Sequence, residues 1–268
     1  MTGMTSKMMR ATTTMLFCLA LSTAAPAQNW GKVITGIYKA HQAMTITDEQ
    51  LAKMVSEEVA YMDKQYKVLG ESNAYTKRLK RVMSGIDSLD SLTLNFKVYK
   101  TSDLNAFACP DGSVRVFSAL MDLLTDEELL GVLGHEMGHV AMKHSKKAWK
   151  SAMMRSAASD AIGVFSDTWS VLSDSFLGSV SSAVLSATHS KVHEMEADDY
   201  GYDFLKNHGK NPRAMIKMFE KLKKMSKQNN SRYTKWLKLF ASHPDYDTRI
   251  NHLKQRCEED GVKPFGGD

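Results

Sequence analysis

The sequence predicts a mostly helical α+β domain with one small antiparallel sheet that contains a hairpin. Capping boxes at residues 47–50 and 125–128, each followed by apolar residues at helical spacing, predict long helices. Alternation of apolar with polar or small residues over 92–99 predicts a half-buried strand. With 268 residues, 43% hydrophobic and 24% charged, the chain can bury a full core, and we expect one domain.

The first 27 residues differ in composition from the rest of the chain. Lys7 and Arg10 precede an uncharged stretch, 11–25, with an apolar middle, and Ala25-Pro26-Ala27 forms an A-x-A signature. This order predicts a Sec-type signal peptide over 1–27, before a single domain over 28–268. An uncleaved N-terminal membrane anchor and a mitochondrial presequence are the alternatives. The predicted location is therefore outside the cytoplasm, most simply a bacterial periplasm.

The net charge gives no support to a nucleic-acid-binding protein, and the cysteine content excludes a disulfide-rich scaffold. Cleavage would remove Lys7 and Arg10 and lower the formal net charge from +5 to +3, so nucleic-acid binding is not expected. Cys109 and Cys257 would remain, which rules out a disulfide-rich scaffold. An oxidising compartment would permit a disulfide between them, but their spacing leaves open whether they meet.

The first half of the domain contains two predicted helices and then the sheet. Helical spacing runs over 47–69 and again over 73–86. The strand at 92–99 follows, then Asn105-Ala106-Phe107-Ala108-Cys109, a turn at 110–113 and a strand at 114–117.

The second half is predicted to be helical. The capping box at 125–128 opens a helix that contains His135 and His139. Residues 145–190 are rich in Ser and Ala and too polar for a membrane span, so we interpret them as amphipathic helices or a lid over a cleft. This segment is also our candidate for peripheral contact with a membrane or a partner. Helices over 192–207 and 212–224 and a closing segment over 243–255 complete the domain.

His135, Glu136 and His139 form an H-E-x-x-H motif. Residues four apart lie one above the other on a helix, so the two imidazoles can bind one metal ion. Zinc accepts two such nitrogens at about 2.0 to 2.1 Å and lowers the pKa of a bound water to about 7. Glu136 can then act as general base and pass the proton to the leaving amine. The motif predicts a zinc endopeptidase with one zinc ion per chain.

Three glycines next to the motif indicate close packing. Gly131, Gly134 and Gly138 each cost a helix about 1 kcal/mol relative to alanine. Three such costs in one helix predict the close approach of another element.

A catalytic zinc needs a third protein ligand. Met142 and Ser145 stand where a metzincin would have Gly and His, so that class is excluded, and His144 is one residue out of place and is expected to face elsewhere. Glu194 is the better candidate, because Asp198 lies one turn further on the same helix face and can orient a ligating imidazole. Glu196 points away as a solvated acid, while His189 and His193 remain rival ligands.

Four ordered motifs resemble a known family. They are Asn105 to Ala108, His135 to His139, Glu194 to Asp198, and His243-Pro244 followed by Arg249. They resemble the gluzincin metallopeptidases that include HtpX, the CAAX prenyl proteases, Oma-type proteases and the periplasmic BepA and LoiP enzymes, over about 73–253. Several of these relatives have membrane spans that this chain lacks, so the soluble exported branch is the better fit.

The resemblance implies a zincin-type fold and a role for each matched residue. His135, His139 and Glu194 would bind zinc, and Glu136 would be the general base and acid. Residues Asn105, Ala106, Phe107 and Ala108 would form an edge strand for an extended substrate. Asn105 and Arg249 would stabilise the oxyanion. His243 would be either a transition-state donor or a fourth zinc ligand at rest, with loop capping as the alternative for both His243 and Arg249.

The leading functional hypothesis is an exported metalloprotease that cleaves misfolded or unassembled envelope proteins. Its partner would be an unfolded or extended polypeptide; the oligomeric state and the cleavage preference are not predicted. A chaperone-like or binding protein with a latent or structural zinc site is the alternative. A third hypothesis, the hydrolysis of a non-peptide substrate, uses the same ligands.

Overall fold

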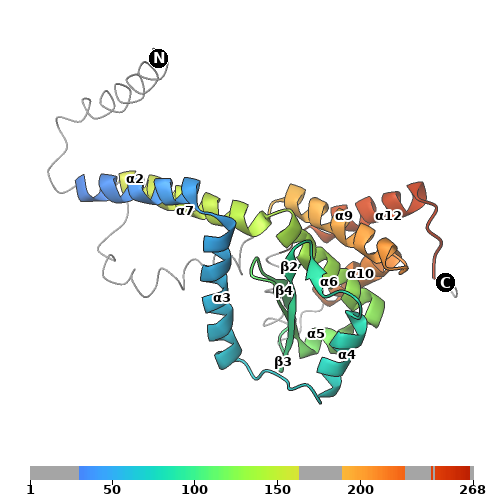
Figure 1. The fold of residues 1–268 in the computed structure, drawn as a ribbon. Helices are drawn as coiled ribbons and strands as arrows, with labels where there is room; N and C mark the ends of the chain where they lie inside the picture. The colour runs from blue at the N-terminus through green and yellow to red at the C-terminus, as the bar shows by residue number, and fades with distance from the viewer. Residues whose placement is uncertain (1–29, 163–188, 227–242, 244, 266–268) are drawn as a thin grey trace, which may run out of the picture.

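The described part of the chain is mostly helical, with two small sheets (Figure 1). The computed structural model describes residues 30–162, 189–226, 243 and 245–265. The class predicted from the sequence is confirmed. The predicted signal peptide lies outside the described residues, as does 163–188 of the segment interpreted as a lid. No helix in the described ranges is long and apolar enough to cross a membrane.

Three helices precede the sheets: α2 (Trp30–Thr45), α3 (Asp48–Gln65) and α4 (Ala74–Val82). The capping box at Thr47 forms as predicted. The predicted helix over 47–69 ends four residues too late, because the chain becomes extended at Tyr66 and Val68 forms an antiparallel bridge with Tyr99. The next helix is also shorter than the predicted 73–86; the side chain of Asn73 caps its start by accepting the Tyr75 N–H.

The main sheet is mixed. A short pair, β1 (Ser88–Leu89) and β2 (Leu92–Thr93), precedes β3 (Asn95–Tyr99), β4 (Ala106–Ala108) and β5 (Ser113–Phe117). The predicted hairpin is β4–β5, but β3 pairs with β5 in parallel, whereas we expected a purely antiparallel sheet. The strand order is β3-β5-β4. Strand β5 is buried at all five positions and lies in the middle, so it pairs with β3 on one side and with β4 on the other, and β4 is at an edge.

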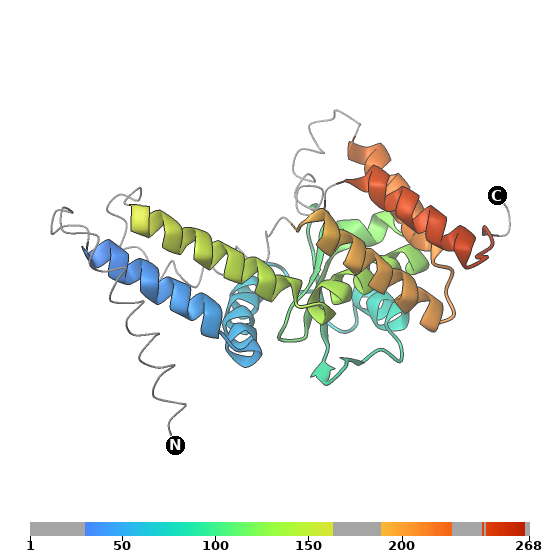
Figure 2. The same ribbon diagram turned by 90° about the horizontal axis from the view of Figure 1, so that it is seen from above.

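Helix α6 (Asp126–Ala141) lies in the helical part of the molecule, and five further described helices follow the sheets in the chain (Figure 1). They are α5 (Ser118–Leu123), α7 (His144–Ile162), α9 (Lys191–Asn207), α10 (Arg213–Ser226) and α12 (Tyr246–Glu259). Helix α6 packs against α9, α10 and β4, while α2 lies along α7, away from the rest of the molecule (Figure 2). The short α5 and the helix α2 were not predicted.

Two apolar clusters hold these elements together. The larger one joins α6, α9, α10 and α12 through residues such as Leu133, Met215 and Leu253, and the smaller one joins α3 to the sheet and α7. Cys257 lies in the larger cluster and Cys109 in the smaller. Both thiols are buried and free, so the question of a disulfide is answered: the two cysteines are not bonded to each other.

Candidate active site

Helix α6 carries the H-E-x-x-H motif through the interior of the protein. Its first turn is fixed by the predicted capping box, in which the Thr125 hydroxyl accepts the Glu128 N–H and the Glu128 carboxylate accepts the Thr125 N–H. Every residue from Glu128 to His139 is buried. A helix that is covered on all sides has a fixed position and rotation, so the motif side chains have fixed directions.

The three glycines of α6 allow the close approach that the sequence predicted. A Cβ on Gly134 would lie 2.8 Å from the Phe204 ring, and one on Gly138 would lie 3.1 Å from the Cα of Ala197. A Cβ on Gly131 would meet the α10 side chain Met215 at 3.0 Å. Helix α9 therefore lies directly against α6, which brings the carboxylates of α9 to the histidines of the motif.

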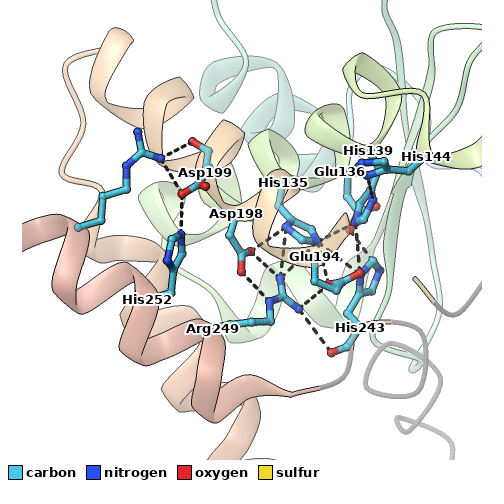
Figure 3. A network of polar contacts seen from close by, with 11 residues as sticks. His135, Glu136, His139, His144, Glu194, Asp198, Asp199, His243, Arg249 and His252 are labelled. Carbon is cyan, nitrogen blue, oxygen red and sulfur yellow. Dashed lines mark hydrogen bonds and ion pairs between the residues drawn. The ribbon is translucent and has the colours of Figure 1, made fainter. Parts of the chain in front are cut away.

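Four side chains converge beside α6: His135, His139, Glu194 and His243 (Figure 3). The Nε2 atoms of His135 and His139 are 3.1 Å apart, and the Glu194 carboxylate oxygens lie 3.6 and 3.5 Å from them. Ligands about 2.0 to 2.1 Å from a tetrahedral ion are themselves about 3.3 Å apart. The three predicted ligands have the separations that zinc requires.

The charges of these groups also suit a cation. Burial and the neighbouring imidazoles hold the pKa of His139 well below its usual value, so its nitrogen lone pair is available. Burial raises the pKa of Glu194, but the hydrogen bond from His243 and the charges around it outweigh burial and lower the pKa to about 2. A neutral imidazole and an ionised carboxylate are both donors that zinc prefers.

Asp198 and Arg249 lie behind the ligands. Asp198 accepts from His135 Nδ1 at 2.9 Å, the place predicted for it. Arg249, buried on α12, donates to both Asp198 oxygens at 2.7 and 2.6 Å and to Glu194 at 2.6 Å. Burial raises the pKa of Asp198, but Arg249 lowers it to about 2. These contacts place the guanidinium group of Arg249 where it holds the two carboxylates. Its role at the oxyanion stays a prediction.

Glu136 and His243 lie close to each other and to the ligands (Figure 3). His243 Nε2 is 3.6 Å from a Glu136 oxygen, and His243 Nδ1 is 3.0 and 3.1 Å from the Glu194 oxygens. Burial raises the pKa of Glu136 above its ordinary value. Burial lowers the pKa of His243, but the carboxylates of Glu136 and Glu194 raise it overall.

The sequence offered further histidines and an acidic residue near the metal ligands, and the structure places them as follows. The His189 ring stacks on the His139 ring with centroids 4.0 Å apart, outside the four-residue group. His193 belongs instead to a second group with His144 and Glu196. The Glu196 side chain is 44% exposed, as expected of a solvated acid, but it also contacts His144 Nε2 at 2.8 Å.

His144 is the residue that sequence reasoning missed. It was expected to face elsewhere, yet its Nδ1 lies 2.9 Å from His139 Nδ1. Spacing gave no signal, because α6 ends between the two residues and Lys143 adopts a left-handed conformation with φ 56°. The turn alone brings His144 back to His139.

The predicted edge strand is one residue shorter than expected. Strand β4 covers Ala106 to Ala108, and Asn105 lies just before it with its carbonyl accepting the Phe117 N–H. No hydrogen bond between the Asn105 side chain and the four-residue group is found among the described residues, so its role at the oxyanion stays a prediction.

Comparisons with known proteins agree with this geometry. The model of peptidase family M48 matches residues 71–257. Metalloprotease LoiP of Escherichia coli K12 is 35% identical over 230 residues, covering 84% of this chain and 87% of LoiP, and metalloprotease YcaL of the same organism is 36% identical, covering 81% and 84%. A beta-barrel assembly-enhancing protease of Yersinia pestis is 28% identical, covering 63% of this chain and 35% of that protein.

A crystal structure of S. mikatae Ste24p is also similar, with a TM-score of 0.49 and 20% identity, over 76% of this chain and 55% of that one. The family match covers more than half of the chain, and it includes the motif helix, the Glu194 helix and most of α12. Peptidases of this family use zinc, and the buried group of His135, His139 and Glu194 is able to bind it. The chain belongs to peptidase family M48 and is a zinc metalloendopeptidase.

Proposed function

We propose that the chain is an exported endopeptidase that cleaves misfolded or unassembled proteins of the cell envelope, with zinc on His135, His139 and Glu194. The observation that carries the catalytic part is the buried group of these three residues, with Glu136 on the same turn of α6. The export part is supported by the signal-peptide pattern of residues 1–27. N-terminal sequencing of the secreted protein should begin at Gln28; a retained Met1 would contradict export with cleavage.

Glu136 is the proposed general base and acid. Zinc, when bound, supplies a Lewis acid that polarises the peptide carbonyl and acidifies water. Glu136 takes the proton of the attacking water and returns it to the leaving amine. Burial raises its pKa above that of an exposed glutamate, the direction that suits a group that both accepts and donates a proton.

Asp198 and Arg249 are the proposed positioning residues. Asp198 holds the Nδ1 proton of His135 and thereby directs Nε2 toward the metal. Arg249 keeps Asp198 and Glu194 ionised and in place through its short contacts with both.

The edge of β4 is the proposed binding site for an extended substrate. The Phe117 N–H donates to the Asn105 carbonyl and the Cys109 N–H to the Ser113 carbonyl, so alternate residues of this segment bond to β5. The main-chain groups of Ala106 and Ala108 consequently point away from β5, toward the side of β4 that has no strand partner among the described residues. Strand β4 packs against α6, so a peptide paired with this edge would run beside the metal group. An edge that recognises main chain favours unfolded polypeptides over folded ones.

His243 makes a latent site the second candidate. Structural zinc sites have four protein ligands, whereas catalytic sites leave one position open. His243 Nδ1 lies 3.4 Å from His135 Nε2 and about as close to Glu194, so it is placed to fill that position. Cleavage would then require His243 to move away.

The test is the conservative variant Glu136→Gln. We expect it to bind one zinc ion per chain, like the unmodified protein, and to lose casein cleavage by about 100-fold or more, because the base is lost while the ligands remain. Continued cleavage would reject Glu136 as the base. A variant that loses cleavage but fully retains its biological effect would favour the chaperone-like alternative, and turnover of non-peptide amides or esters without peptides would favour the third hypothesis.

A further inference from the structure

The turn between α6 and α7 places a buried histidine against a zinc ligand. Helix α6 ends at Ala141, Lys143 takes the left-handed conformation, and α7 begins at His144. The His144 side chain is 0% exposed. Its Nδ1 lies 2.9 Å from His139 Nδ1, on the side of the His139 ring opposite to the metal group (Figure 3).

The position of the metal decides which ring carries the shared proton. His139 Nε2 faces His135 and Glu194, so it is the nitrogen that would bind zinc. A neutral imidazole that binds through Nε2 carries its proton on Nδ1. His139 Nδ1–H therefore donates to His144 Nδ1. The proton of His144 must then be on Nε2, where it donates to Glu196 at 2.8 Å.

We propose that His144 is a positioning residue for the zinc ligand His139, and that Glu196 holds His144 in the tautomer this requires. The proposal rests on the zinc site proposed above. It gives each ligating imidazole one partner behind it: Asp198 behind His135, and His144 with Glu196 behind His139. Such partners fix the orientation of a ligating ring and increase its basicity.

The same residues could instead bind a second metal ion with His193. The rings of His144 and His193 are stacked, with centroids 4.3 Å apart and planes 17° apart, and Glu196 lies beside them. A metal on His144 Nε2 would place the proton of His144 on Nδ1, directly opposite the Nδ1–H of a zinc-bound His139. Two N–H donors cannot share a 2.9 Å contact, so zinc at the first site argues against a metal at the second.

Zinc affinity and histidine tautomers test the proposal. Zinc binding to the full chain would be measured by competition with a chromophoric chelator, with circular dichroism as the check of folding. His144→Ala should lower zinc affinity by roughly 10- to 100-fold. His144→Gln should recover part of it, because an amide oxygen can accept the His139 proton. His193→Ala is the matched control, since His193 stacks on His144 and, among the described residues, its side chain makes no hydrogen bond to His139 or His144. This variant should bind one zinc ion with unchanged affinity.

The spectroscopic readout is ¹⁵N NMR of the zinc-loaded, histidine-labelled protein. We expect protonated Nδ1 on His139 and protonated Nε2 on His144. Folded His144→Ala with unchanged zinc affinity, or a His144 proton on Nδ1, would overturn the proposal. Two zinc ions per chain, one of them lost in His193→Ala, would show a second metal site instead. If His139→Ala retains full zinc affinity, the proposed zinc site is wrong. This outcome is distinct from the failure of the His144 proposal alone, in which His139→Ala loses zinc but His144→Ala does not.

Discussion

Replacing Gly138 with alanine would insert a methyl group between α6 and α9 at the level of the metal ligands. The new Cβ would lie 2.9 Å from the Tyr200 Cβ and 3.1 Å from both the Cα and the carbonyl oxygen of Ala197. Backbone atoms cannot rotate aside as the tip of a side chain can, so the two helices must separate. Glu194 lies one turn before Ala197 on α9, and the separation would draw its carboxylate away from the histidines.

Two opposing effects set the magnitude. Alanine stabilises a helix interior by about 1 kcal/mol relative to glycine. Overpacking a tight interface costs about 1 to 3 kcal/mol. The free energy of unfolding should therefore fall by about 0 to 2 kcal/mol, which lowers Tm by up to about 8 °C for a protein of this size. Zinc affinity should fall by about tenfold or more, the scale on which ligand positioning acts.

Gly131→Ala is the matched control in the same helix. Its new Cβ meets the flexible side chain of Met215 at 3.0 Å, and that side chain can move. We expect unchanged zinc affinity and a stability equal to that of the unmodified protein or up to about 1 kcal/mol higher. Thermal unfolding of the metal-free proteins and chelator competition would measure both quantities. If Gly138→Ala matched Gly131→Ala in stability and zinc affinity, the close approach of α6 and α9 at the ligands would be refuted.

Three further substitutions test other parts of the structure. Arg249→Met leaves two buried carboxylates without their cation, so metal-free protein should lose about 3 to 5 kcal/mol of stability, measured by urea unfolding, and zinc should restore part of it; an unchanged midpoint would contradict the pairing. Burial raises the pKa of Asp63, but hydrogen bonds, led by the one from Arg115, outweigh burial and lower the pKa from 3.8 to about 2. A lowered carboxyl pKa stabilises the fold at pH values above the ordinary pKa, and this stabilisation is lost as the pH falls toward the lowered pKa. Asp63→Asn should therefore cost about 2 kcal/mol at pH 7 and flatten the loss of stability between about pH 4 and pH 2, whereas an unchanged acid limb of the stability curve would disprove this. His243→Ala should speed zinc removal by a chelator and increase casein cleavage by opening the fourth position; a large loss of cleavage would make His243 a catalytic donor.

The parts of the fold that the sequence predicted are those with local causes. The helix starts at Thr47 and Thr125 follow from capping boxes, whose partners are three residues apart. The close approach of another element to α6 was predicted from Gly131, Gly134 and Gly138, because three glycines lower the stability of a helix unless they permit close packing. The pairing of Glu194 with Asp198 on one face follows from helical periodicity.

The parts that the sequence did not predict depend on contacts between distant segments. The parallel pairing of β3 with β5 depends on where the β4–β5 hairpin lies, which alternation alone does not define. The partnership of Arg249 with Asp198 was not predicted, because the two residues are 51 positions apart in the sequence. The contact of His144 with His139 depends on one left-handed residue, Lys143, which carries no sequence signal of its own.

Anomalous diffraction at the zinc edge from crystals of zinc-loaded Glu136→Gln protein would test the central claim most directly. The account predicts one zinc ion per chain, within about 2.0 to 2.2 Å of His135, His139 and Glu194. A zinc ion bound by His144, His193 and Glu196 instead, or no zinc ion at the motif helix, would contradict it.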